Sequence, residues 1–87
     1  MIQFEIQANI TPSKLVEFNQ SKMSFILDVM KMKGYAGFTE KQADHFWMII
    51  NWDTNDNLND FLKSDSYKFF HGAVITLGKK FKARKCS

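Results

Sequence analysis

The sequence predicts an α+β fold, with one antiparallel sheet covered by helices. Apolar and polar residues alternate at the N-terminus, which indicates a half-buried strand. An apolar stripe at helical spacing follows, and then two strand-like runs lie on either side of a polar turn. The full order of elements is strand, helix, strand, strand, helix, strand, which is the ferredoxin-like arrangement βαββαβ. With 87 residues, the chain is expected to form a single domain, residues 1–87.

The first strand is predicted over Ile2–Ala8, where apolar and polar side chains alternate strictly. Thr11 is a preferred N-cap residue, and Pro12 suits the first position of a helix. A helix is therefore predicted from there to about Met30. Gly34 follows and can close it.

The inward stripe of this helix includes two polar residues, Asn19 and Lys22. In one interpretation, the lysine stem covers apolar surface while its charge reaches water, and Asn19 is hydrogen-bonded. In the other, both side chains line a cavity between helix and sheet. The apolar members of the predicted stripe are Leu15, Phe18, Met23, Phe25, Ile26, Val29 and Met30.

Two strands are predicted next, over Tyr35–Lys41 and His45–Trp52, with the polar string KQAD (residues 41–44) between them. The second is apolar on both faces, because Trp47 and Ile49 alternate with other large apolar residues. A strand buried on both faces needs a helix layer on one side and a second layer on the other. This requirement, together with the 45% apolar content, favours a second copy as partner, in a homodimer.

The C-terminal half is predicted to contain a helix that starts at Asp53 or Thr54, both good N-caps. It breaks near Ser64, which can cap a following helical segment that carries His71. Gly78 is expected to end that segment in the left-handed conformation. The run KKFKARK, residues 79–85, then reads as a short last strand with its basic side chains facing outward.

That basic run supplies much of the net charge of +3, so the remaining surface is not basic. Its side chains can pair with Glu5 on the first strand, the expected neighbour in the sheet. The string KGYAGF, residues 33–38, resembles an RNA-binding signature, but it lies on the second strand instead of the third. An additional Gly37 also changes the face on which Phe38 emerges. No nucleic-acid partner is therefore expected.

Cys86 is the single cysteine, so the chain cannot form an internal disulfide and needs no oxidising compartment. The N-terminus has no basic region followed by a long apolar run, and no stretch approaches ~18 consecutive apolar residues. We therefore expect a cytoplasmic protein without a membrane partner. No set of His, Cys, Asp and Glu has zinc-binding spacing, and no metal or cofactor is expected.

Two long segments carry a resemblance to a known family. The string INWDTNDNLNDFLKSDSYKFFHGAVITLG, residues 50–78, resembles the second half of the antibiotic biosynthesis monooxygenase family. The string GYAGFTEKQADHFWMIINW, residues 34–52, is similar to the preceding hairpin of that family. The resemblance implies a dimeric α+β barrel, with two sheets back to back and a pocket between helices and sheet in each subunit.

The resemblance also implies a function. Members of the family include cofactor-free oxygenases that act on quinols and aromatic polyketides. Such chemistry needs a dry apolar pocket and a base that works near neutral pH, for which histidine is suited. In this hypothesis His71 is the base, Lys22 stabilises the phenolate, and Asn19 or Tyr67 orients a small apolar or aromatic substrate. The candidate site residues are the catalytic His71 and the substrate-binding Asn19, Lys22, Phe25, Trp52 and Tyr67.

Two alternatives remain open at this stage. In the haem-degrading branch of the family, a histidine on the last helix is the axial ligand of the iron, and LKSDSYKFFH places His71 at that position. That branch also uses a Trp and an Asn where this chain has Phe61 and Ile6, which argues against haem degradation. The second alternative is a non-catalytic dimeric module, in which His71 is a core residue bonded to a backbone carbonyl.

Overall fold

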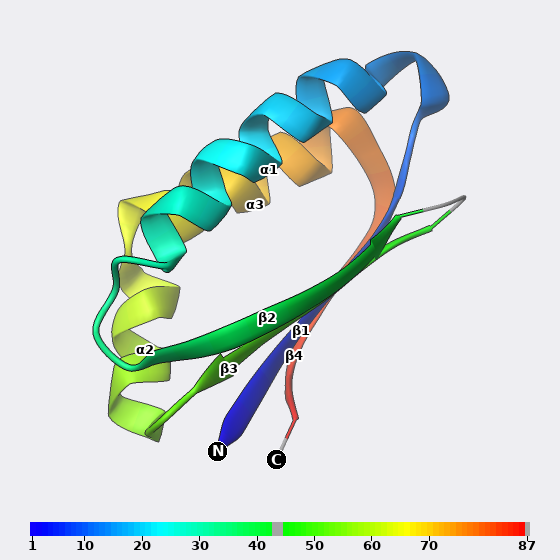
Figure 1. Cartoon of the computed structure of the whole chain (residues 1–87). Helices are drawn as coiled ribbons and strands as arrows, with labels where there is room; N and C mark the ends of the chain where they lie inside the picture. The colour runs from blue at the N-terminus through cyan, green and yellow to red at the C-terminus, as the bar shows by residue number, and fades with distance from the viewer. Residues whose placement is uncertain (43–44, 87) are drawn as a thin grey trace.

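The computed structural model describes residues 1–42 and 45–86, and its elements follow the predicted order. Four strands form one antiparallel sheet in the order β2-β3-β1-β4 (Figure 1). The predicted ferredoxin-like α+β fold is confirmed. The strands are β1 (Ile2–Ile10), β2 (Tyr35–Gln42), β3 (Phe46–Trp52) and β4 (Gly78–Cys86). The helices are α1 (Leu15–Val29), α2 (Asn55–Lys63) and α3 (Asp65–Leu77), and a 3-10 turn, η1 (Pro12–Lys14), precedes α1.

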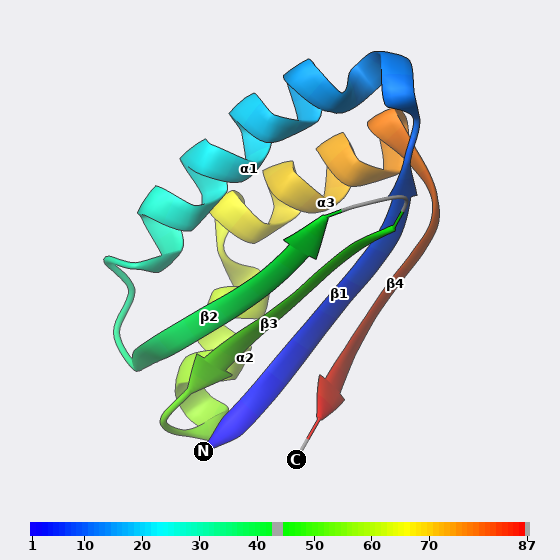
Figure 2. The same cartoon turned by 45° about the vertical axis from the view of Figure 1, so that its right-hand side comes forward.

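The helices lie on one face of the sheet and leave the other face open in this chain (Figures 1 and 2). Side chains alternate along the two central strands, so every second residue of β1 and β3 points toward the helices. On β3 the buried residues alternate with half-buried ones, so within this chain only the helix-facing side of the strand is fully covered, and the predicted burial of its other face depends on a partner. The core between the layers contains Phe4, Ile6, Ala8, Ile10, Phe18, Phe25, Val29, Phe46, Met48, Ile50, Trp52, Leu58, Phe61, Phe70, Val74 and Leu77.

Two of the three predicted N-caps are confirmed. The backbone N–H of Asn57 donates to Thr54 Oγ1 over 3.2 Å at the start of α2, and Tyr67 N–H donates to Ser64 Oγ over 3.2 Å at the start of α3. Thr11 takes the predicted N-cap position, with Pro12 directly after it, but its side chain makes no capping bond. The turn that begins at Pro12 is a 3-10 turn, and the backbone carbonyl of Thr11 accepts from the N–H of Lys14 over 2.8 Å.

Two glycines have different roles. Gly34 has φ of +86°, and its carbonyl accepts from the Asp53 N–H over 3.0 Å, so it forms the turn that joins α1 to β2 beside the start of α2. Gly78 does not have the predicted left-handed conformation, since its φ is −142° and it begins β4. A Cβ there would lie 2.6 Å from the carbonyl oxygen of Asn9, so close approach to β1 favours glycine at this position.

Several boundaries differ from the predictions. β1 extends beyond its predicted C-terminal end, to Ile10, and β4 extends beyond both of its predicted ends, to Gly78 and Cys86. The two strands pair with each other over these added residues. His45 precedes β3 instead of starting it, and the predicted turn partly falls on residues 43–44, outside the described residues. Among the described residues, no helix is long and apolar enough to cross a bilayer.

The inward stripe of α1 is narrower than predicted. Phe18, Lys22 and Phe25 are buried as expected, with Val29. Met23 and Met30 are more than half exposed, so their assignment to the inward face is wrong. They lie on the far side of the helix from Phe18 because each residue turns the helix by about 100°. α1 is therefore apolar on its outer surface as well.

Candidate functional site

His71 lies where α3 meets β4. Its half-buried ring stacks on Phe81 of β4, with ring centroids 4.5 Å apart and planes 23° apart. Tyr67, one helical turn earlier, lies 5.8 Å from it between ring centroids. Within residues 1–42 and 45–86, the imidazole nitrogens make no hydrogen bond to a backbone carbonyl or to any other group. The ring is thus held by its faces, and its nitrogens are available to a ligand.

The predicted site residues converge on a residue that sequence reasoning did not assign to the site. Phe61 of α2 lies 4.8 Å from Trp52, 5.0 Å from Tyr67 and 5.9 Å from Phe25, measured between ring centroids. Tyr67 in turn contacts His71. Four of the six predicted residues therefore belong to one aromatic cluster around Phe61. The spacing of Leu58 and Phe61 along α2 indicates the inward face of that helix. It does not indicate that Phe61 lies at the centre of the aromatic cluster.

Trp52 ends β3 inside this cluster, and its side chain has no exposed surface. Its indole Nε1–H has no acceptor among the described residues. A buried N–H without a partner is destabilising by about 1–3 kcal/mol, so native proteins rarely leave one unpaired. The indole is therefore an uncommitted donor that a ligand oxygen could satisfy.

Tyr67 is the second polar member of the cluster. Burial raises the pKa of its phenol above the ordinary value of 10.0, because the charged phenolate would lose hydration. The hydroxyl consequently keeps its proton at neutral pH. It can donate a hydrogen bond beside His71, but it cannot serve there as a base.

The two predicted polar residues of α1 lie elsewhere. Lys22 is buried, and its Nζ lies 3.1 Å from Glu40 Oε1 and 3.2 Å from Gln42 Oε1, both on β2. This arrangement matches the interpretation in which the stem covers apolar surface and the charge finds a polar environment. Asn19 is exposed on the helix surface. Neither residue joins the cluster of His71 in this structure.

The layer between helices and sheet is filled by aromatic rings. Phe25 stacks on Phe70 with 4.1 Å between centroids and 6° between planes. A hollow of about 210 Å³ reaches Phe61 from outside, and its volume is below the ~300–1,000 Å³ of typical ligand pockets. A wider hollow of about 400 Å³ lies between α1 and α3 and reaches Phe25 and Phe70. Neither hollow is lined by Trp52, so a substrate that contacts its indole would have to displace at least one ring. The smaller hollow is lined by Met32, Lys33, Asn57, Asp60, Phe61 and Ser64.

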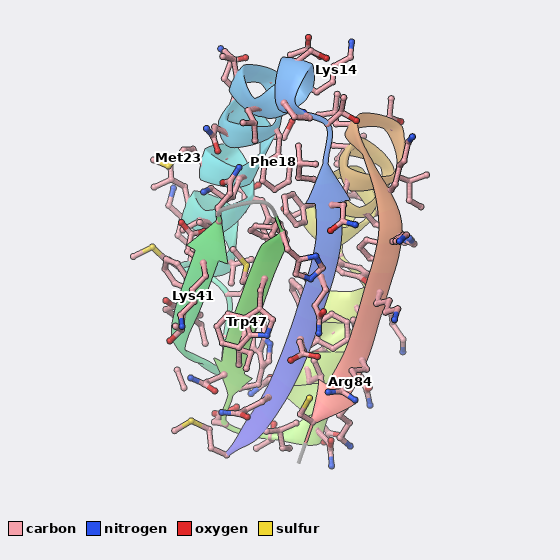
Figure 3. All side chains as sticks on the ribbon, turned by 90° about the vertical axis from the view of Figure 1, so that its right-hand side faces the viewer. Lys14, Phe18, Met23, Lys41, Trp47 and Arg84 are labelled. Atoms are coloured by element: carbon pink, nitrogen blue, oxygen red, sulfur yellow. The ribbon has the colours of Figure 1, made fainter. Side chains whose placement is uncertain are left out.

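The open face of the sheet carries a polar network that sequence reasoning found only in part. The carboxylate of Glu5 accepts from Trp47 Nε1 over 2.9 Å, from Gln7 Nε2 over 2.8 Å and from Arg84 Nε over 2.9 Å (Figure 3). These donors, with Trp47 contributing most, hold the pKa of the carboxyl below its ordinary value of 4.5. The predicted pairing of the basic last strand with Glu5 is confirmed by the Arg84 contact.

Metal chemistry has little support from the geometry. Within the described part of the chain, no three His, Cys, Asp or Glu side chains lie close enough together to hold a metal ion. A haem would need only one axial protein ligand, and His71 is the histidine whose nitrogens make no bond to the described residues.

Comparison with known proteins identifies the class of fold. No known family model matches the sequence, and no curated protein matches it. Solved structures do match: the chain has the fold of proteins named antibiotic biosynthesis monooxygenases, which confirms the predicted resemblance at the level of structure.

One structure with that name superimposes with a TM-score of 0.87 and 10% identity, covering 100% of this chain and 97% of its own. SnoaB, a cofactor-independent oxygenase from Streptomyces nogalater, gives a TM-score of 0.85 and 12% identity, covering 99% and 90%. A conserved protein from Methanosarcina mazei Go1 superimposes with a TM-score of 0.88 and 19% sequence identity. The match covers 98% of this chain and 89% of that protein. At these identities the likeness establishes the fold alone.

Proposed function

We propose that this chain is a cofactor-independent monooxygenase that acts on a small phenol or quinol. The observation that carries the proposal is His71, a half-buried histidine with no hydrogen bond to the described residues, placed beside the aromatic cluster. The shared fold with SnoaB, which is named a cofactor-independent oxygenase, supports the same reaction class.

The reaction would begin with proton transfer. A nitrogen of His71 takes the proton of the substrate hydroxyl, which leaves an electron-rich phenolate. This anion reduces dioxygen, the oxidant, and forms a carbon–oxygen bond at a ring carbon. Loss of water then leaves a quinone: one oxygen atom of dioxygen becomes the new carbonyl, and the other leaves with two substrate hydrogens. No electrons are needed from a cofactor.

The surrounding residues would supply binding and orientation. The unpaired Nε1–H of Trp52 can donate to a substrate oxygen, and the protonated Tyr67 hydroxyl can donate beside it. Phe25 and Phe61 provide apolar walls that exclude water, which strengthens these hydrogen bonds. Entry to the cluster requires a ring to move. The hollow of about 210 Å³ reaches Phe61, and the hollow of about 400 Å³ between α1 and α3 reaches Phe25.

The proposed assembly is a homodimer in which the open faces of two sheets pack together. Trp47 and Ile49 are half-buried on that face and would supply its apolar contacts. The polar pairs around Glu5 are already satisfied within the chain, so they can be covered without leaving a charge unpaired.

The test is oxygen uptake by the purified chain with a panel of phenols and quinols. His71→Ala should abolish uptake, whereas His45→Ala, the other histidine of the chain, should retain it. Trp52→Phe keeps an aromatic ring but removes the indole N–H together with part of the ring volume, so it should slow uptake, and urea unfolding of the same variant shows whether the fold is preserved. Substrate-dependent uptake that survives in His71→Ala would contradict the proposed role of this residue.

The second candidate function is haem binding, which the uncommitted nitrogens of His71 favour. A haem titration distinguishes it from the proposed oxygenase. A Soret shift with haemin that is lost in His71→Ala, without quinol-dependent oxygen uptake, would indicate a haem protein. Absence of both signals would leave a non-catalytic dimeric module that binds a small apolar molecule or no ligand.

A further inference from the structure

The outer face of α1 carries an apolar stripe that the sheet-to-sheet dimer would leave uncovered. Val16 is 72% exposed, Met23 56%, Leu27 54% and Met30 52%. Met23 projects away from the body of the molecule in Figure 3. The side chains of the opposite face of the same helix are buried in the core. A helix that is apolar on both sides normally has partners on both sides.

The spacing of the stripe is that of a helix–helix seam. Val16, Gln20, Met23, Leu27 and Met30 follow one another at intervals of four, three, four and three residues. This is the heptad pattern that aligns side chains along one line of a helix facing another helix. Gln20 is the one polar member, and a single polar residue in such a seam fixes register and partner number.

We propose that the outer face of α1 docks against the same face of a second copy, with the two helices antiparallel across a two-fold axis. The proposal does not depend on the proposed enzymatic function. A two-fold contact pairs a patch with itself, so one apolar stripe is sufficient. Met23, the middle residue of the stripe, would lie close to its own counterpart, and Val16 would lie near the other copy's Met30.

The charges beside the stripe favour this orientation. Glu17 lies in the first turn of α1 and Lys31 lies two residues beyond its end, and both are exposed. Antiparallel docking brings Glu17 of one copy toward Lys31 of the other, once on each side of the axis. Asp28 lies near the same place, but its carboxylate accepts from Ser66 Oγ of α3 in its own chain over 2.9 Å. Parallel docking would instead place like charges near each other at each end. The helix dipoles also attract in the antiparallel arrangement.

A membrane surface fits the stripe less well. Helices that lie on membranes have a polar face rich in Lys and Arg. The exposed residues that flank this stripe include Glu17, Asn19 and Ser24. Among the exposed charges beside the stripe, Glu17 and Asp28 are acidic and Lys31 is basic, so the flank is mixed in charge instead of basic, and a protein surface with matching charges is favoured.

The first experiment measures molar mass by light scattering after size-exclusion chromatography. Leu27→Lys should lower the mass of the wild-type assembly at equal concentration, to that of a sheet-to-sheet dimer where the sheet contact forms and to that of a monomer where it does not. Ile75→Lys, which introduces the same charge at an equally exposed apolar residue of α3, should leave the mass unchanged. Ile49→Lys tests the sheet-to-sheet interface separately. The result for the contact between two α1 helices therefore does not depend on the result for the sheet. A monomeric wild type, or a mass unaffected by Leu27→Lys, would overturn the proposal.

The second experiment tests orientation by cross-linking in a Cys86→Ser background. Met23→Cys alone should form a cross-linked pair. Val16→Cys and Met30→Cys should cross-link when mixed, but much less when each is alone. Efficient self-linking of Val16→Cys would overturn the antiparallel arrangement. Sedimentation of the wild type with phosphatidylcholine–phosphatidylglycerol vesicles, lost in Leu27→Lys, would assign the stripe to a membrane instead and overturn the proposal.

Discussion

The two faces of the sheet are stabilised by different interactions, although their central residues are buried almost equally. Phe4 and Glu5 are neighbours on β1 with 5% and 8% exposure, and they point to opposite faces. Phe4 packs against the rings of Phe61 and Tyr67. Glu5 instead accepts three hydrogen bonds. Burial alone therefore does not predict how a position responds to mutation, since one face depends on volume and the other on charge.

The largest effect is expected on the helix-facing side. Phe61→Ala removes the ring that contacts Phe25, Trp52 and Tyr67, so unfolding in urea should show a loss of about 3–5 kcal/mol. Phe69→Ala, at a 78% exposed position of α3, is the matched control and should change stability by less than about 0.5 kcal/mol. A small loss in Phe61→Ala would mean that the cluster can collapse or hold water, as an open pocket would.

The second prediction concerns the charged contact between Lys22 and Glu40 on the helix-facing side. Lys22→Met should cost about 1–3 kcal/mol, because Glu40 and Gln42 lose their donor in a partly buried site. Its measurement is again urea unfolding. Lys22→Met combined with Glu40→Gln should cost little more than the single change, because no carboxylate is then left without a partner. Full additivity of the two changes would show that the contact contributes nothing.

The elements on both faces were predictable because their signals are local. Alternation marks β1, a nearly continuous apolar run marks β3, and short polar side chains mark the starts of α2 and α3. The candidate site was predictable only in part. Phe61 and Phe81 become neighbours of the predicted residues through tertiary packing, and Lys22 finds Glu40 on a strand distant in sequence. The Met23 assignment failed because periodicity locates an apolar face without showing whether the core or a partner covers it.

The third prediction is that the stability contributed by the open face depends on pH through the carboxylate of Glu5. The folded-state pKa of Glu5 is lowered, so its carboxylate stabilises the fold above its ordinary pKa of 4.5, and this contribution is lost as pH falls through the lower folded value. Glu5→Gln should reduce stability at pH 7 by less than Lys22→Met does and should flatten the fall below pH 4.5. Thermal unfolding across pH measures this difference. Glu17→Gln is the control and should keep the wild-type slope, while an unchanged slope in Glu5→Gln would contradict the network.

The smallest effect is expected at the far end of the same network. His45 Nδ1 lies 2.5 Å from Asn9 Oδ1, and its Nε2 lies 3.0 Å from Gln7 Oε1. These are short contacts, but the side chain is exposed and water can replace both partners. His45→Ala should therefore change the free energy of unfolding by less than about 0.5 kcal/mol in urea. Gln7 also donates to Glu5, so a loss as large as that of Lys22→Met would show that the open-face bonds reinforce one another. The open face would then be a cooperative unit like the aromatic core, and the contrast between the two faces would no longer hold.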